Sequence, residues 1–195
     1  MNSILRKSVL GIAGLTVAGG LAAGPLNHTD STPTTRDTAV TTTQAATLDT
    51  ATLIPHGVQG TQSHIDLTDE QTANVKAIIA ATKKAGMDER AAVVSIATAL
   101  QESKLENLGH LGDRNDHDSQ GLFQQRPSSG WGTVEQITDP EYSTTAFLKG
   151  LKQVDGWRDM PLTKAAQTVQ VSAYPDHYAQ WEQQAADLVA QHWNS

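Results

Sequence analysis

The sequence predicts a mainly α-helical domain over residues 67–195, with a small extended or β segment around 119–126. Two observations favour this class. Apolar residues recur at helical spacing in segments that begin with capping residues, and only one short segment suits a strand. The chain has 195 residues, which suggests one domain with extensions. It contains no cysteine, so disulfides and thiolate metal sites contribute nothing to the fold.

The first 24 residues are typical of a secretory signal peptide. Arg6 and Lys7 form a short basic region, an uncharged apolar stretch follows, and small residues before position 25 suit cleavage. A membrane anchor is the alternative, because no charge lies between Lys7 and Asp30. However, the apolar part is shorter than the roughly 20 residues of a membrane-spanning helix. We therefore expect export, to the medium or the cell wall, and membrane contact only if this segment stays uncleaved.

Residues 25–66 are predicted to form a disordered linker. Eleven of the 24 residues from Thr29 to Thr52 are threonine, with mainly alanine, aspartate and serine between them. This composition offers too little apolar surface to offset the entropy lost on ordering. The part from Leu53 to Asp66 is ambiguous, because it combines a few apolar residues with a proline and two glycines.

Two helices are predicted at the start of the folded domain. Thr68 and Gln71 form a capping box before the first, which ends in two lysines and a glycine. Asp88 caps the second helix, whose faces carry apolar or small residues all round, as in a fully buried helix. The apolar run of this second helix ends at Glu102.

Three further helices follow a polar, turn-rich loop over residues 107–119 and the short extended segment. The first of them begins at Asp139, which precedes a proline and an acidic residue. Its predicted apolar face includes Tyr142. The next is expected over residues 163–172, and the last after Pro175 with Tyr178 on its apolar face.

Glu102 is a candidate catalytic acid because it lies at the C-terminal end of the buried helix. Partial burial and the partial negative charge of a helix C-terminus both disfavour a carboxylate, so we expect a raised pKa. A glutamic acid that stays protonated near neutral pH can donate its proton to a glycosidic oxygen. Position alone leaves an ordinary surface glutamate as the alternative.

Three motifs in order resemble those of the soluble lytic transglycosylase family, in the lysozyme-like superfamily near goose-type lysozyme. They are Gln101-Glu102-Ser103, the segment Gly121-Leu122-Phe123-Gln124 that runs to Pro127, and Ala173-Tyr174. The resemblance spans about residues 74 to 190. It implies that the α-helical domain has a lysozyme-like fold.

The resemblance also implies roles for individual residues. Glu102 corresponds to the general acid/base of the family, and Ser103 to a serine that supports the site by hydrogen bonding. The segment that lines the sugar groove corresponds to Gly121, Leu122 and Gln124. Tyr174 corresponds to a tyrosine that hydrogen-bonds near the catalytic glutamate. Pro175 departs from the family, which usually has asparagine there, and it has no amide to hold a substrate acetamido group.

The implied activity is cleavage of the β-1,4 bond between N-acetylmuramic acid and N-acetylglucosamine in peptidoglycan. In this family one glutamate protonates the leaving oxygen and then deprotonates the C6 hydroxyl of the sugar, which gives a 1,6-anhydro product without water. Asp113, Asp116 and Asp118 are candidates for a second carboxylate. If one of them positions a water molecule, the product is hydrolytic, as for a lysozyme. Both outcomes stay open.

Expected partners follow from charge and chemistry. The net charge of -7, without a basic patch, argues against nucleic acid. The resemblance implies that the protein acts on the glycan strands of peptidoglycan, and we expect a monomer. The polar loop over residues 107–119, which contains several aspartates and two histidines, lacks the ligand pattern of a calcium or transition-metal site. We therefore expect no metal and no cofactor. An inactive wall-binding or structural module of the same fold is the main alternative. A secreted protein that binds metal through this loop is a third.

Overall fold

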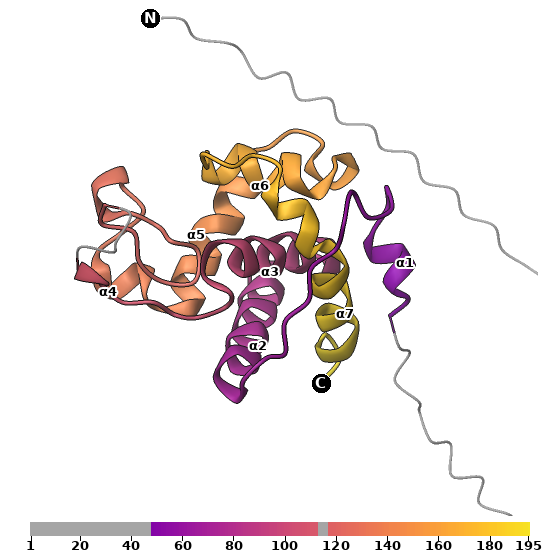
Figure 1. Ribbon diagram of the computed structural model, residues 1–195, viewed down its shortest axis with the longest axis horizontal. Coiled ribbons are helices and arrows are strands. Elements are labelled where there is room, and N and C mark those ends of the chain that lie inside the picture. The colour runs from indigo at the N-terminus through magenta and orange to yellow at the C-terminus, as the bar shows by residue number, and fades with distance from the viewer. Residues whose placement is uncertain (1–47, 113–116) are drawn as a thin grey trace, which may run out of the picture. The chain divides into compact units, whose positions relative to one another are not determined.

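The computed structural model describes residues 48–112 and 117–195, all within one compact unit, Thr43–Ser195. The predicted signal peptide, the first part of the predicted linker, and Asp113 and Asp116 lie outside the described residues. The described part is mainly α-helical, as predicted (Figure 1). None of its helices is both long and apolar enough to cross a lipid bilayer.

Helices of very different length make up the domain. The α-helices are α1 (Thr50–Leu53), α2 (Asp69–Lys84), α3 (Glu89–Ser103), α4 (Val134–Ile137), α5 (Pro140–Leu151), α6 (Leu162–Gln170) and α7 (Glu182–His192). Short 3-10 helices are η2 (Pro127–Ser129), η3 (Trp157–Asp159) and η4 (His177–Trp181). The segment expected to be extended or β, residues 119–126, is a tight turn closed by one antiparallel bridge between Gln120 and Gln125.

Helix α3 lies at the centre, in contact with α2, α5, α6, α7 and η4 (Figure 1). Its residues from Ala91 to Leu100 are all buried, which confirms the prediction of a helix buried on every side. The Asp88 side chain caps it by accepting a hydrogen bond from the Ala91 N–H. Because many of its side chains are alanine, serine or threonine, neighbouring helices can approach its backbone closely.

Helix α2 begins at the predicted capping box of Thr68 and Gln71. Two of its amide side chains also hold the chain just after α3. Gln71 Nε2 donates to Lys104 O at 2.8 Å, and Asn74 Nδ2 donates to Leu105 O at 2.9 Å. Lys104 and Leu105 both have left-handed backbone conformations, with φ of 57° and 63°. These bonds therefore fix the direction in which the chain leaves α3, just beyond Glu102.

Residues 48–66 form an ordered strap against the domain, so the predicted linker is wrong for these residues. Leu53 and Ile54 are buried in the common core. Further along, Ser63 N–H donates to Gln180 O at 2.7 Å, and Gln62 Nε2 donates to Ala179 O at 3.0 Å. Few apolar side chains suffice here because the strap also hydrogen-bonds to η4. We call residues 48–66 the N-terminal strap.

The C-terminal half of the domain follows the prediction with shifted boundaries. Asp139 caps α5 as expected, but Tyr142 is exposed and the buried face of the helix includes Phe147. The expected final helix starts as the 3-10 helix η4 and becomes α-helical at Glu182. Tyr178, at the second position of η4, is fully buried. Within this final segment, the tyrosine that faces the interior is therefore the one inside η4, Tyr178.

Candidate active site

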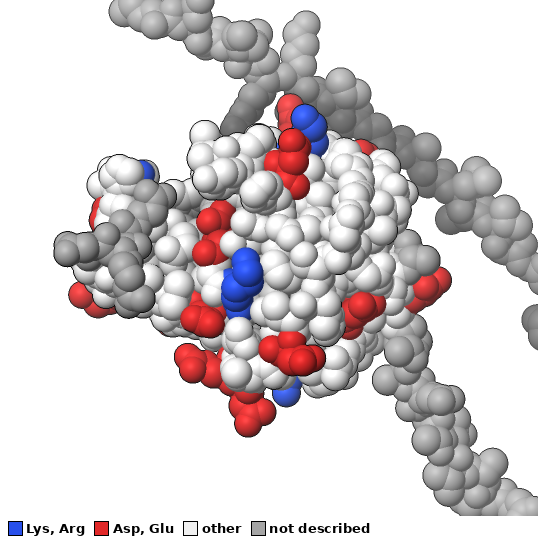
Figure 2. All heavy atoms as spheres, viewed as in Figure 1, with Lys and Arg blue, Asp and Glu red and all other residues white. Residues whose placement is uncertain are grey.

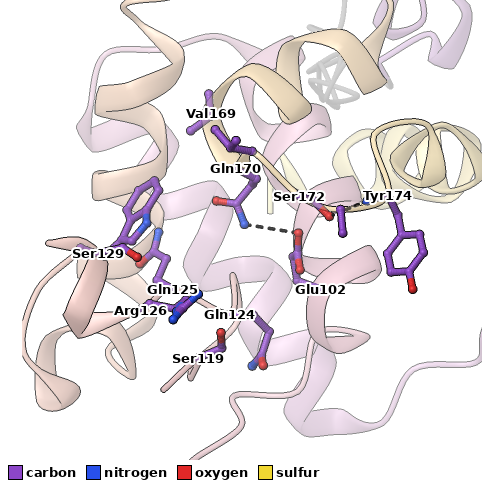
Figure 3. A pocket seen from close by; sticks show the side chains of 13 residues that line it. Glu102, Ser119, Gln124, Gln125, Arg126, Ser129, Val169, Gln170, Ser172 and Tyr174 are labelled. Carbon is purple, nitrogen blue, oxygen red and sulfur yellow. Dashed lines mark hydrogen bonds between the residues drawn. The ribbon is translucent and has the colours of Figure 1, made fainter. Parts of the chain in front are cut away.

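A groove of about 640 Å³ opens beside the C-terminal end of α3. Three parts of the chain line it: the last turn of α3, the segment from 119 to 131, and the segment from 169 to 174 (Figure 3). Among the described residues that line it, Glu102 is the only carboxylate. The others are mostly amides, hydroxyls and apolar groups, with one arginine, Arg126. The described lining therefore presents a single acid and a single arginine among neutral hydrogen-bonding and apolar groups.

The Glu102 side chain is half-buried and is held by side chains from two other elements. Tyr178 Oη donates a hydrogen bond to Glu102 Oε1 at 2.6 Å, and Gln170 Nε2 lies 3.4 Å from the same oxygen (Figure 3 marks the bond from Gln170). Burial raises the pKa of Tyr178, and the Glu102 carboxylate raises it further, while a hydrogen bond with Ser172 acts in the opposite direction. The phenol stays protonated and acts as a donor to the carboxylate.

A tight turn at residues 121–124 forms the floor next to Glu102, and three successive carbonyl groups of this turn accept side-chain hydrogen bonds. Gly121 O accepts from Gln124 Nε2 at 2.9 Å. Leu122 O accepts from Ser103 Oγ at 2.9 Å. Phe123 O accepts from Gln170 Nε2 at 2.8 Å. Because donors come from α3 and α6 as well as from the turn, both helices are tied to the floor of the groove.

Glycine is required at the first position of this turn. Gly121 has φ of +77°, and a Cβ atom there would lie 2.0 Å from Ile137 O. Its N–H donates to Leu108 O at 2.7 Å, so the backbone is fixed on both sides. Gln124 also has a left-handed conformation, with φ of 47°. Such backbone conformations hold where surrounding contacts fix them, as at many functional sites.

The structure separates the predicted groove residues into two groups. Gln124 lines the groove, as the resemblance implies. Leu122 is fully buried in the core and contributes only its carbonyl group to the site. The neighbouring Phe123 is buried as well and stacks on Phe147, with ring centroids 5.1 Å apart. Ser103 is buried and ties the end of α3 to the turn without lining the groove.

Tyr174 lines the groove, but the hydrogen bond expected of it is made by Tyr178. Tyr174 is 62% exposed and lies in the irregular segment before η4, whereas Tyr178 lies inside η4 and faces the core. Trp131 lines the groove, and Trp157 is buried away from it. The aromatic residue that supports Glu102 is therefore four residues beyond the motif that suggested it.

Asp118, one of the three candidates for a second carboxylate, makes structural contacts at the start of η2. Its carboxylate accepts hydrogen bonds from Ser128 N–H at 2.7 Å, Ser128 Oγ at 2.8 Å and Arg126 Nε at 3.0 Å. The Ser128 N–H, the Arg126 side chain and the Ser128 hydroxyl together hold the pKa of Asp118 well below its usual range. It stays ionised and pins η2, and it does not line the groove. Asp113 and Asp116 lie outside the described residues.

No group of three or more histidine, aspartate or glutamate side chains with metal-binding geometry is present in the described part of the chain. His110 Nδ1 accepts a hydrogen bond from Gly112 N–H at 3.0 Å, which serves the local turn. General acid/base chemistry at Glu102 requires protons and a substrate only.

Gln170 and Tyr178 support Glu102 but carry no local sequence signal for that role. Gln170 is the last residue of α6, where polar side chains are common, and its neighbours in the chain form no known motif. Tyr178 is predicted to be buried from helical spacing, but spacing alone does not show that its hydroxyl reaches Glu102. Their role depends on the packing of α6 and η4 against α3.

The chain matches none of the known protein-family models and none of the curated protein sequences with which it was compared.

Proposed function

We propose that this protein is exported and cleaves the glycan strands of peptidoglycan at the β-1,4 bond between N-acetylmuramic acid and N-acetylglucosamine, with Glu102 as general acid/base. One observation carries the proposal: Glu102 is the single carboxylate among the described lining residues, half-buried, with Tyr178 fixing its Oε1 atom. The motifs around Glu102, Gln124 and Tyr174 support a lysozyme-like active site. The protein would thus act as a lytic transglycosylase or a muramidase.

The polar lining suits a sugar strand. The amides of Gln124 and Gln170 and the hydroxyl of Ser129 supply donors and acceptors for sugar hydroxyl and acetamido groups. On the face shown in Figure 2, charged side chains are scattered and the basic ones form no extended cluster. These features favour a largely uncharged polymer over a polyanion.

The reaction needs two proton transfers at one carboxyl group. Because Oε1 accepts the hydrogen bond from Tyr178, the acidic proton of Glu102 belongs on Oε2. In the first step, this proton moves to the glycosidic oxygen as the bond from that oxygen to C1 breaks. In the second step, the carboxylate takes a proton from the oxygen that attacks C1. If that oxygen is the C6 hydroxyl of the same sugar, the product is a 1,6-anhydro sugar; if it is water, the product is hydrolytic.

Because the described lining supplies one carboxylate, it favours the anhydro route, in which the sugar provides its own nucleophile. A hydrolytic product would instead point to Asp113 or Asp116 as the group that positions water, since Asp118 is ion-paired with Arg126 and is not itself among the described lining residues.

The test is Glu102→Gln, which keeps the shape and the hydrogen bond from Tyr178 but cannot transfer the proton. We expect glycan cleavage to fall by a factor of about 10² to 10⁴. Glu106→Gln is the matched control, because Glu106 is exposed and does not line the groove. Purified peptidoglycan is digested with each variant and the released muropeptides are identified by mass spectrometry. Cleavage by Glu102→Gln at the wild-type rate would sink the assignment.

The second candidate function is a binding or structural module that holds peptidoglycan without cutting it. Pro175 favours it, because this residue follows the groove wall and offers no side-chain amide, while its carbonyl accepts a hydrogen bond from Thr163 Oγ1 at 2.7 Å. The same experiment separates the two functions. A module would bind insoluble peptidoglycan and release neither reducing ends nor anhydro-muropeptides.

A further inference from the structure

An exposed aromatic ring stands at the end of one groove wall. The wall consists of residues 169–174, and Tyr174 at its end is 62% exposed. Its ring stacks on the imidazole of His177, with centroids 4.9 Å apart and an angle of 18° between the rings. In Figure 3 the Tyr174 side chain lies beyond Glu102 and turns away from its carboxylate. The ring is therefore free of the catalytic hydrogen bonds but continuous with the groove.

The backbone around this ring is fixed, although the side chains are exposed. Tyr174 N–H donates to Ser172 Oγ at 3.2 Å, and His177 N–H donates to Tyr174 O at 3.2 Å. Val171, in the same wall, is 79% exposed and has φ of 52°. A β-branched residue in the left-handed region is strained, and strained residues concentrate at ligand sites. In the free protein the apolar side chain of Val171 is exposed to solvent, so burial does not compensate for the backbone strain.

We propose that Tyr174, supported by His177 and flanked by Val171, forms an outer sugar subsite that stacks on the C–H face of a pyranose ring. The proposal rests on the proposed function, since it takes the occupant to be the glycan strand whose scissile bond lies at Glu102. A stacked aromatic pair offers a broad apolar surface with a hydroxyl at its edge, which matches the apolar face and polar rim of a sugar ring. Because Tyr174 and Val171 line the same groove as Glu102, one continuous strand can occupy both places.

This subsite should add affinity only for strands long enough to reach it. We expect Tyr174→Ala to weaken binding of long strands by about two- to tenfold, the range of an aromatic stacking contact. Binding of short strands that occupy only the sugars next to Glu102 should not change. Tyr174→Phe keeps the ring and should retain most of the long-strand affinity.

The experiment measures binding of peptide-free N-acetylglucosamine oligomers of increasing length by titration calorimetry. Every protein carries Glu102→Gln, so that the oligomers survive. Tyr142→Ala is the matched control, because Tyr142 is also an exposed tyrosine but does not line the groove. The expected result is a gain of affinity with length that disappears in Tyr174→Ala and persists in Tyr174→Phe and Tyr142→Ala.

Three results would overturn the subsite: the same gain with length in Tyr174→Ala, equal losses for short and long oligomers, or an equal loss in Tyr142→Ala. The experiments distinguish an error in the proposed subsite from an error in the proposed cleavage activity. If the protein with Glu102 intact cuts no glycan but its long-strand binding depends on Tyr174, the subsite stands and the proposed cleavage is wrong. If it cuts glycan and Tyr174→Ala has no length-dependent effect, cleavage stands and the subsite is wrong.

Discussion

The hydrogen bond from Tyr178 to Glu102 should contribute more free energy when the glutamate is charged than when it is neutral. Tyr178→Phe removes only the hydroxyl that lies 2.6 Å from Glu102 Oε1. A hydrogen bond to a charged group contributes about 1.5–3 kcal/mol, and one between neutral groups about 0.5–1.5 kcal/mol. Since Glu102 is only half-buried, the lower end of the range for charged groups applies, about 1.5 kcal/mol. The coupling energy between the two side chains is the difference between this value and that of the neutral bond, so we expect about 1 kcal/mol.

A double-mutant cycle measures this coupling. The free energy of unfolding is determined in urea over a range of pH for the wild type, Tyr178→Phe, Glu102→Gln and the double variant. Where Glu102 is ionised, Tyr178→Phe should be more destabilising in the wild-type background than in the Glu102→Gln background, and loss of the contact with Ser172 cancels because it occurs in both. The difference should vanish at a pH low enough to protonate Glu102. An equal effect of Tyr178→Phe in both backgrounds at every pH would show that the hydroxyl does not hold the carboxylate.

Two further predictions concern the floor and the rim of the groove. Gly121→Ala should lower the free energy of unfolding by about 2–5 kcal/mol, because it combines backbone strain with an overlap against Ile137 O. Gly130→Ala is the control: Gly130 has φ of +81° and no neighbouring atom within 4 Å, so this substitution should show the strain alone. Equal effects of the two substitutions in urea unfolding would contradict the overlap at Gly121. Asp118→Asn should destabilise the protein at neutral pH through the loss of charge-assisted bonds, with Ser128 N–H foremost. Because the folded-state pKa of Asp118 is depressed, its stabilisation is present above the unfolded pKa and is lost as the pH falls through the folded pKa. Unfolding curves of wild type and Asp118→Asn should therefore converge in strong acid, and a difference that stays constant with pH would refute the role.

Local signals were sufficient to predict where the main helices begin. Thr68, Asp88 and Asp139 each cap the helix that the sequence assigned to them, because a cap bonds to N–H groups only two or three residues away. The burial of α3 also followed from its composition. The position of Glu102 at the end of a buried helix was therefore accessible from the sequence alone.

Contacts between distant segments were not predictable in the same way. The N-terminal strap has a weak apolar pattern, and it is ordered because the Ser63 N–H and the Gln62 side chain donate hydrogen bonds to η4, more than 110 residues later. Tyr174 belongs to the motif and Tyr178 lies four residues beyond it, and η4, which starts at His177, carries the tyrosine that reaches Glu102. Gln170 reaches Glu102 through the packing of α6 on α3, which no local pattern specifies.

The supports of Glu102 differ in kind from the forces that hold the domain together. The core is apolar and centred on α3, whereas the carboxylate and its floor are held by single bonds from Tyr178, Gln170 and Ser103. The bonds from Gln170 and Ser103 to backbone carbonyl groups contribute only about 0.5–1.5 kcal/mol each, and the bond from Tyr178 to the carboxylate about 1.5–3 kcal/mol, so the loss of one leaves the core intact. The N-terminal strap supports Glu102 only indirectly, because it hydrogen-bonds to η4, which carries Tyr178. Substitutions at these donors should therefore reorient the carboxylate before they unfold the domain, which makes the proposed cleavage activity a more sensitive readout of the site than stability.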